Sequence, residues 1–158
     1  MGVNAKNWYS SFDIDHFLVD RHRCYSTTIV NVICHTGMTA VSVLDSAMNN
    51  ERFESYIRDA LCVTLHKCDI VIWDNLPAYK SSVARTLIEG KGASLLALPP
   101  YIHDLNPIEN AFEKMKSRLS KKKIRDVVKL RNFLLQSEKF FSKAECKNYI
   151  RHAGYDLY

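Results

Sequence analysis

The chain has 158 residues, 47 % of them apolar and 25 % charged, with 22 Lys or Arg against 17 Asp or Glu and a formal net charge of +5. This composition is typical of one globular domain with a hydrophobic core and excludes a disordered or fibrous protein. No segment approaches the roughly 18 consecutive apolar residues of a membrane span, and the N-terminus lacks the apolar core of a secretory signal. We therefore expect a cytoplasmic protein, associated with the nucleoid if its source is bacterial.

Five cysteines, at positions 24, 34, 62, 68 and 146, include no C-x-x-C pair. An odd number without such a pair indicates neither a disulfide framework nor a zinc ribbon. Cys62, His66 and Cys68 offer three soft ligands around one turn, but a structural zinc site usually needs four. We expect these residues to pack in the core instead of binding metal.

The basic residues are concentrated in one segment. Nine of them fall between positions 114 and 131, where Asp126 is the single acid, so this segment carries a charge of +8. The other 140 residues sum to −3, with 13 basic against 16 acidic side chains. Such a block is often a solvated helix face, but it is also the electrostatic pattern expected for contact with phosphates. We favour nucleic-acid binding over the solvated face.

The first half of the chain predicts a hairpin followed by a helix. Two alternating, β-branched runs at 26–34 and 39–44 flank a short turn and indicate paired strands. Asn49 or Asn50 then caps a helix in which apolar residues recur at helical spacing, with a basic end at 66–67.

Two short apolar runs in the middle of the chain predict strands buried on both faces. The first, 70–73, ends on Asp74, and the second covers 93–98. Between them, 82–89 predicts a helix that ends at glycines. The residues of this helix expected to face inward are Val83, Leu87 and Ile88.

Three helices are expected in the C-terminal part. One starts at Asn106 and Pro107 and carries an apolar stripe, the second spans about 125–139, and the third follows a capping box at 142–145 and ends near Gly154. The stripe consists of Ile108, Ala111, Phe112, Met115 and Leu119. This order of elements predicts a three-layer α/β domain with a mixed sheet, in which functional side chains gather where parallel strands end.

Three motifs carry a specific resemblance. They are DNLPAYK at 74–80, LPPY at 98–101 and DLNPIEN at 104–110, and 34 residues separate Asp74 from Glu109. In this order they resemble the catalytic domain of the mariner superfamily of DDE transposases, most closely its bacterial insertion-sequence branch. The resemblance extends over residues 23–158, including the tail at 144–155, and leaves 1–22 as a non-matching leader.

The resemblance implies an RNase H-like fold in which three carboxylates hold two Mg²⁺ or Mn²⁺ ions for DNA strand cleavage and transfer. By motif, Asp74 is the second acid and Glu109 the third, so both are expected to be catalytic metal ligands. Alternatively, Asp74 is a turn residue, and Glu109 is the capping-box partner of Asn106. The implied partner is DNA, as element ends and target, and a homodimer is a further expectation. The side chains expected to contact DNA are Lys114, Lys116, Arg118, Lys121, Lys122 and Lys123.

The sequence departs from the family pattern in its first acid, which should stand about 30 residues before the hairpin, upstream of Met1. Ile102-His103 and Tyr79 are lesser departures, since the family usually has Ser-Pro and His there. Asp13 or Asp15 could replace the first acid, but we favour a leader left by truncation. The expected fold is therefore an RNase H-like sheet that lacks or replaces its first, central strand.

Three interpretations follow. The chain is an active transposase domain, alone or completed by a separately encoded N-terminal half; or it is an inactive remnant; or it is a non-enzymatic, basic module that binds nucleic acid. Because two carboxylates are a weak basis for holding two metal ions, we expect the chain alone not to be a competent transposase.

Overall fold

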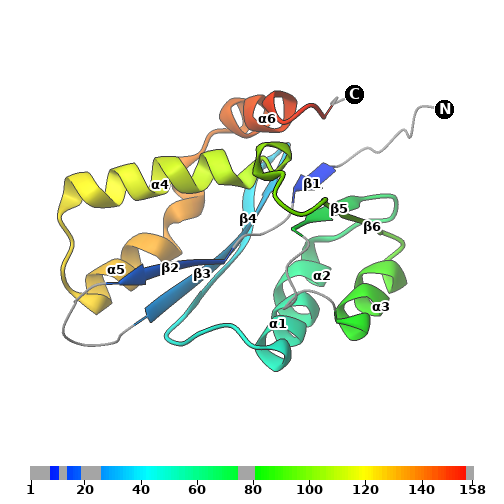
Figure 1. The fold of residues 1–158 in the computed structure, drawn as a ribbon, viewed down its shortest axis with the longest axis horizontal. Helices are drawn as coiled ribbons and strands as arrows, with labels where there is room; N and C mark the ends of the chain where they lie inside the picture. The colour runs from blue at the N-terminus through cyan, green and yellow to red at the C-terminus, as the bar shows by residue number, and fades with distance from the viewer. Residues whose placement is uncertain (1–7, 11–13, 19–25, 75–80, 156–158) are drawn as a thin grey trace.

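The computed structural model describes residues 8–10, 14–18, 26–74 and 81–155, in which helices cover both faces of one mixed sheet (Figure 1). The strands are β1 (Trp8–Ser10), β2 (Ile14–Leu18), β3 (Ser26–Cys34), β4 (Gly37–Leu44), β5 (Ile70–Trp73) and β6 (Ser94–Ala97). The helices are α1 (Asn50–Tyr56), α2 (Cys62–Thr64), α3 (Ser82–Gly90), α4 (Ile108–Lys122), α5 (Val127–Leu135) and α6 (Lys143–His152). A π-helical turn (Ile57–Leu61) joins α1 to α2, and 3₁₀ turns at His103–Leu105 and Ser137–Phe140 precede α4 and follow α5.

The centre of the sheet is occupied by β1. Its backbone pairs in parallel with β5, Tyr9 opposite Val71, and antiparallel with β3, Tyr9 opposite Cys34. β2 continues alongside the first half of β3, with Ile14 opposite Val30, so β1 and β2 together fill one interrupted strand position. The expectation that the sheet lacks its central strand was therefore wrong. A three-residue strand is too short to show an alternating pattern, which is why sequence periodicity did not reveal it.

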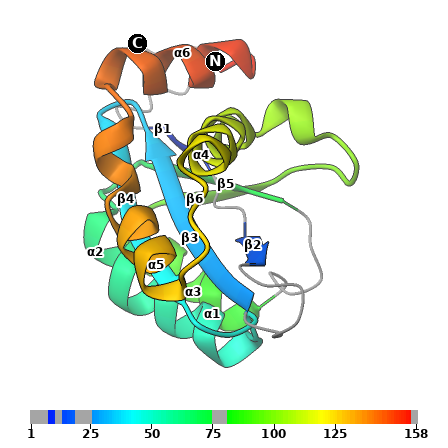
Figure 2. The ribbon, with the colours of Figure 1, turned by 90° about the vertical axis from the view of Figure 1, so that its left-hand side faces the viewer.

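The predicted hairpin is confirmed as β3 and β4, which pair antiparallel with an irregularity between Val30 and Val32. The faces of β3 separate two cores because successive side chains of a strand point to opposite sides. Val30 and Val32 pack with α1, α3 and β5, whereas Ile29 and Ile33 pack with α4 and α5. Figure 2 shows the resulting layers, with the sheet between the two groups of helices.

The helix predicted after the hairpin begins as expected, since the Asn49 side chain accepts a hydrogen bond of 2.8 Å from the Arg52 N–H. It ends at Thr64, before the predicted basic end, and its middle turn is π-helical. The next helix, α3, also matches its prediction in extent, and Ile88 is buried and Leu87 partly buried as predicted. Ala84 is buried there, whereas Val83 is 43 % exposed, so the expectation for Val83 was wrong.

The strand predicted at 93–98 exists as β6, but it is not buried on both faces. β6 has β5 as its single described neighbour and forms the edge of the sheet, so Ser94 and Leu96 are exposed. In an apolar run of this length, sequence alone does not distinguish an edge strand from a central one.

The C-terminal helices cover the other face of the sheet. The apolar stripe of α4 is confirmed, with Ile108 and Phe112 buried and Leu119 partly buried. The helix predicted at 125–139 is shorter than expected, because α5 ends at Leu135 and a 3₁₀ turn follows. α6 begins at its predicted cap, where the Ser142 hydroxyl accepts a hydrogen bond of 3.2 Å from the Glu145 N–H. Within the described ranges, no helix is long and apolar enough to cross a bilayer.

Candidate active site

Asp74 lies where the sheet predicts a functional carboxylate. It follows the last residue of β5 and is 8 % exposed. β5 runs parallel to both β1 and β6, so Asp74 stands at the carboxyl edge of three parallel strands. The Leu98 N–H donates a hydrogen bond of 2.8 Å to the Trp73 carbonyl, which holds the end of β6 beside that of β5. In open α/β sheets, this edge is where ligands bind.

Glu109 lies in the first turn of α4 and is partly buried. Its backbone N–H donates to the Asn106 carbonyl at 3.2 Å, which joins the helix to the 3₁₀ turn before it. The first turn of a helix carries unpaired N–H groups and the positive end of the helix dipole, both of which favour a carboxylate there.

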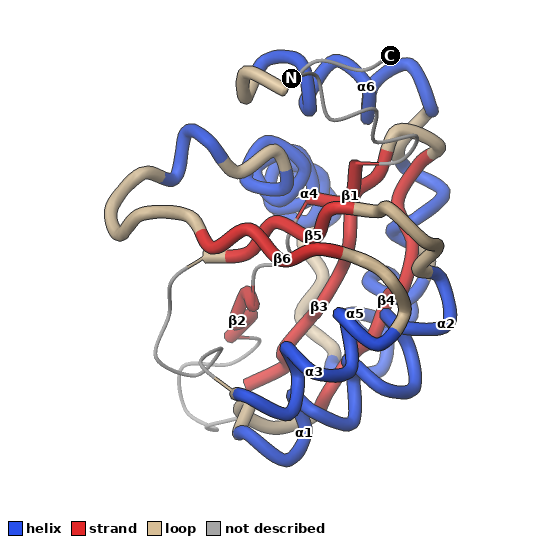
Figure 3. The backbone as a smooth tube through the Cα atoms, turned by 90° about the vertical axis from the view of Figure 1, so that its right-hand side faces the viewer, coloured by secondary structure: helices blue, strands red, loops and turns tan. Residues whose placement is uncertain are grey.

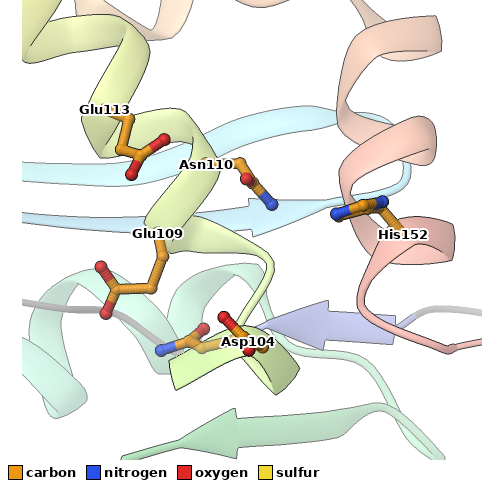
Figure 4. Close-up of a pocket in the computed structure, with 6 residues that line it drawn as sticks. Asp104, Glu109, Asn110, Glu113 and His152 are labelled. Carbon is orange, nitrogen blue, oxygen red and sulfur yellow. The ribbon is translucent and has the colours of Figure 1, made fainter. Parts of the chain in front are cut away.

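A polar cavity of about 460 Å³ opens between the start of α4 and the end of α6 (Figure 4). Asp104, Asn106, Glu109, Asn110, Glu113 and His152 line it. Asn110 and His152 point toward one another from the two helices, while Glu109 and Glu113 extend from the same side of α4. Asp74 is not among the lining residues, so the cavity brings together Glu109 and acids that the motifs did not single out.

Asn106 is the unusual residue of this cavity. Its side chain is 1 % exposed, yet neither its amide nitrogen nor its carbonyl oxygen has a hydrogen-bond partner among the described residues. The capping-box alternative for Glu109 requires the Asn106 side chain to accept a bond from the helix backbone. The described structure contains no such bond, so the Asn106 side-chain half of this alternative was wrong. Buried polar groups are usually paired, so an unpaired amide on a cavity wall indicates a missing water or ligand.

The donor types around Asp74 and Glu109 suit Mg²⁺ or Mn²⁺, because both ions prefer carboxylate and amide oxygens. The number of donors falls short, however. In the part of the chain that the structure describes, no three His, Cys, Asp or Glu side chains are placed to hold one metal ion. Of the two candidates for the first acid, Asp13 lies outside the described residues, and Asp15 lies on β2 with its backbone opposite Ile29. The described residues therefore fit part of a metal site.

The zinc alternative receives no support from the described residues. Cys62 is buried in the core, as expected, whereas His66 and Cys68 are exposed. The expectation of core packing was therefore right for Cys62 and wrong for the other two.

The basic segment divides into two kinds of side chain. Lys114 is engaged within the protein: its ammonium donates to the Glu145 carboxylate and, at 3.2 Å, to the Phe140 carbonyl, and it lies 5.0 Å from the centre of the Phe141 ring. Arg118 and Lys122 also lie over aromatic rings, at 5.0 and 5.5 Å, but remain exposed. Cation–π packing of this kind orients a long side chain without removing its charge from solvent.

A second hollow, of about 380 Å³, lies where α4 turns toward α5. Its lining is Lys116, Leu119, Ser120, Lys123, Ile124 and Arg125. α4 ends at Lys122 and is capped by Lys123, whose φ of 50° places it in the left-handed region. Two of the predicted DNA-binding residues, Lys116 and Lys123, thus come together with Arg125, which lay outside that prediction. Lys121 and Lys122 are exposed on the same last turn of α4.

The fold and the acids at its edge define a class of protein: an RNase H-like domain of mixed α/β architecture. The family model described as DDE superfamily endonuclease matches residues 3–131, and the chain belongs to this family. The matched range includes most of the 1–22 segment that the motifs did not cover. No curated protein sequence matches the chain.

Solved structures share the fold at low sequence identity. The catalytic domain of Mos1 mariner transposase matches with a TM-score of 0.72 and 16 % identity, covering 95 % of this chain and 76 % of that one. The Mos1 catalytic domain with Raltegravir and Mg matches at 0.72 and 14 % identity, covering 99 % and 87 %. The Mos1 strand transfer complex matches at 0.71 and 15 % identity, covering 94 % of this chain and 51 % of the transposase.

Proposed function

We propose that this chain is a transposase catalytic domain that cleaves and transfers DNA strands with divalent metal ions. The observation that carries the proposal is the position of Asp74 at the carboxyl end of β5, and of Glu109 in the first turn of α4, in a chain of the DDE endonuclease family. Further support comes from the fold, which is that of Mos1 structures described as containing Mg and as a strand transfer complex. We also propose that the chain belongs to the insertion-sequence branch, acts in the cytoplasm or at the nucleoid, and works as a homodimer.

Asp74 and Glu109 would hold the metal ions, Mg²⁺ or Mn²⁺, through carboxylate oxygens. Bound there, the ions would supply an activated water or 3′-hydroxyl and stabilise the leaving oxygen. The protein's own part is to fix the two carboxylates on rigid elements, since β5 is held between two parallel neighbours and α4 is packed through its apolar stripe. The unpaired Asn106 amide and the adjoining carboxylates of Asp104 and Glu113 would bind the water around the ions.

The first acid, the remaining member of the three, is proposed to come from the segment that follows β1. β1 and β5 run in parallel, so their carboxyl ends meet at one edge of the sheet, and Asp13 stands three residues beyond Ser10, the last residue of β1. Asp15 and an acid from a separately encoded N-terminal half are the alternatives. The occupied central strand favours a source within this chain.

DNA is the proposed partner, and we propose that the exposed cations at the end of α4 contact its phosphates. Lys116, Lys123 and Arg125 line one hollow, and Lys121 and Lys122 lie on the same turn. Lysine is a flexible point charge, so these contacts would position the duplex without reading its bases.

A nicking assay on supercoiled plasmid tests the proposal without knowledge of the element ends. The purified chain is incubated with Mn²⁺ or Mg²⁺, beside the variants Asp74→Asn, Glu109→Gln, Asp13→Asn and Asp15→Asn. Glu89→Gln is the matched control, because Glu89 is an exposed carboxylate on α3. We expect the wild type and the Glu89 control to nick the plasmid. The Asp74 and Glu109 variants should lose nicking, and so should one of the two variants at Asp13 and Asp15.

Mn²⁺ binding, followed by electron paramagnetic resonance, separates the alternatives. Binding that depends on Asp74 and Glu109, without nicking, would support an inactive or incomplete domain, in which neither Asp13 nor Asp15 serves as the first acid. DNA binding with neither Mn²⁺ binding nor nicking would support the non-enzymatic basic module and contradict the proposed function.

A further inference from the structure

The segment between β6 and α4 projects from the body of the domain (Figure 3). It covers residues 98–105 and carries the most exposed large hydrophobic residue of the described ranges, Tyr101, at 94 %. Ile102 and Leu105 are also exposed, as are the two prolines before the tyrosine. An exposed tyrosine ring contributes little to the core, and its apolar face is available to contact a ligand.

The backbone holds Tyr101 in a defined but strained conformation. Its φ of 66° is in the left-handed region, which residues with a side chain rarely adopt. Hydrogen bonds fix the segment at both ends. At its start, the Leu98 N–H donates to the Trp73 carbonyl at 2.8 Å, and at its end the Leu105 carbonyl accepts from the Tyr155 hydroxyl at 2.9 Å. Strain in an anchored segment that presents a ring to solvent is typical of a binding residue.

Tyr101 lies close to the proposed reaction site. Asp104, three residues further on, lines the same cavity as Glu109. Because an extended chain spans at most about 3.6 Å per residue, the Cα atoms of Tyr101 and Asp104 lie within about 11 Å of each other. That distance corresponds to about three base steps of B-DNA, at 3.4 Å per step along one strand.

We propose that Tyr101 stacks on an unpaired base of the DNA strand that enters the cavity beside Glu109. This inference rests on the proposed function and adds a contact to it. Base stacking on an aromatic ring works for any base, because every base has a π-face. Bases inside a duplex are already stacked, so the ring would bind a base at a strand end or in a single-stranded overhang, within a few nucleotides of the cleaved bond.

A nucleic acid explains the exposed ring better than a protein partner does. A protein seated on Tyr101 would lie beside the cavity, because the Cα atom of its lining residue Asp104 is within about 11 Å of that of Tyr101. The proposed function requires that cavity to stay open to DNA. A single strand, by contrast, can contact the ring and the cavity together.

The test uses the full chain and a duplex with a three-nucleotide overhang that contains 2-aminopurine, whose fluorescence falls when it stacks. Tyr101→Ala removes the ring, Tyr101→Phe retains it, and Val63→Ala truncates an exposed apolar side chain on α2, in the opposite helix layer. We expect the wild type, Tyr101→Phe and Val63→Ala to quench the probe. Tyr101→Ala should bind the overhang about 5- to 150-fold more weakly, without the quench, and a blunt duplex unchanged.

Thermal unfolding and sedimentation complete the test. Tyr101→Ala should unfold at the wild-type temperature, because the ring is solvent-exposed. A lowered unfolding temperature, unchanged affinity for the overhang, or a loss of self-association without loss of overhang binding would each overturn the inference. The failure of the proposed function is a separate result: Asp74→Asn should lose nicking yet quench the probe as the wild type does.

Discussion

Lys114 on α4 and Glu145 on α6, 31 residues apart in the chain, form an ion pair that joins the two helices. Each side chain is 27 % exposed, and Glu145 also accepts a hydrogen bond of 2.9 Å from the Tyr149 hydroxyl. The pair ties α4 to α6, the two helices between which the cavity opens, so a lysine expected to contact DNA has a structural partner. Whether it also contacts phosphate stays a prediction.

Lys114→Met should destabilise the domain by about 1–3 kcal/mol, because it leaves a partly buried carboxylate without its charged donor. The measurement is the free energy of unfolding in urea at pH 7. Arg131→Met is the control: its ion pair with Asp45, at 2.6 Å, is largely solvent-exposed, and loss of such a pair should cost about 1 kcal/mol or less. Equal losses in the two variants would contradict the structural role of Lys114.

The same pair predicts an acid-sensitive contribution to stability. Burial alone would raise the pKa of Glu145, but the hydrogen bonds from Lys114 and Tyr149 outweigh it and hold the pKa below its usual value. A carboxyl with a lowered pKa stabilises the fold above its unfolded pKa of about 4.3, and the contribution is lost as the pH falls through the folded value. The difference in unfolding free energy between wild type and Glu145→Gln should therefore be constant near neutral pH and shrink below about pH 4.3.

The sequence predicted the helices and strands that show a periodic pattern of apolar residues over neighbouring positions. Alternation revealed β3 and β4, and the stripe from Ile108 to Leu119 revealed α4. The central strand was missed because Trp8–Ser10 is defined by its pairing with β3 and β5, which no local pattern encodes. The edge position of β6 was missed for the same reason, since it too depends on which strands pair.

For the candidate site, the motifs identified Asp74 and Glu109 but not the environment of either. The Asn106 amide, which has no partner among the described residues, lies between the 3₁₀ turn and α4, and His152 of the cavity stands 43 residues after Glu109. Contacts between segments so far apart depend on the tertiary fold. The signals available in sequence were the Asn-Pro dipeptide and the tail resemblance, and neither specifies a cavity.

The lysines at the end of α4 predict a salt-dependent effect on DNA affinity. Replacing Lys121, Lys122 and Lys123 by Ala should weaken binding to every duplex about equally and reduce the slope of log K against log salt by up to about three units. Fluorescence anisotropy over a salt series measures both quantities. A triple variant at Arg58, Lys67 and Lys91, exposed cations away from α4, should leave the slope near the wild-type value. An unchanged slope in the α4 variant would contradict the prediction and indicate that these lysines lie on a solvated helix face that does not contact DNA.

Asn106 offers the sharpest separation of stability from ligand binding. Replacing an unsatisfied buried amide by an apolar group of similar size removes a desolvation penalty of about 1–3 kcal/mol, so Asn106→Leu should be at least as stable as the wild type in urea. If the amide binds the water around ions held by Glu109, the same variant should bind Mn²⁺ more weakly, by an amount that calorimetry measures. Asn110→Leu is the matched control, since Asn110 lines the same cavity but is less buried. A clear loss of stability in Asn106→Leu would mean that the amide has a structural partner, and unchanged Mn²⁺ affinity would remove Asn106 from the metal site.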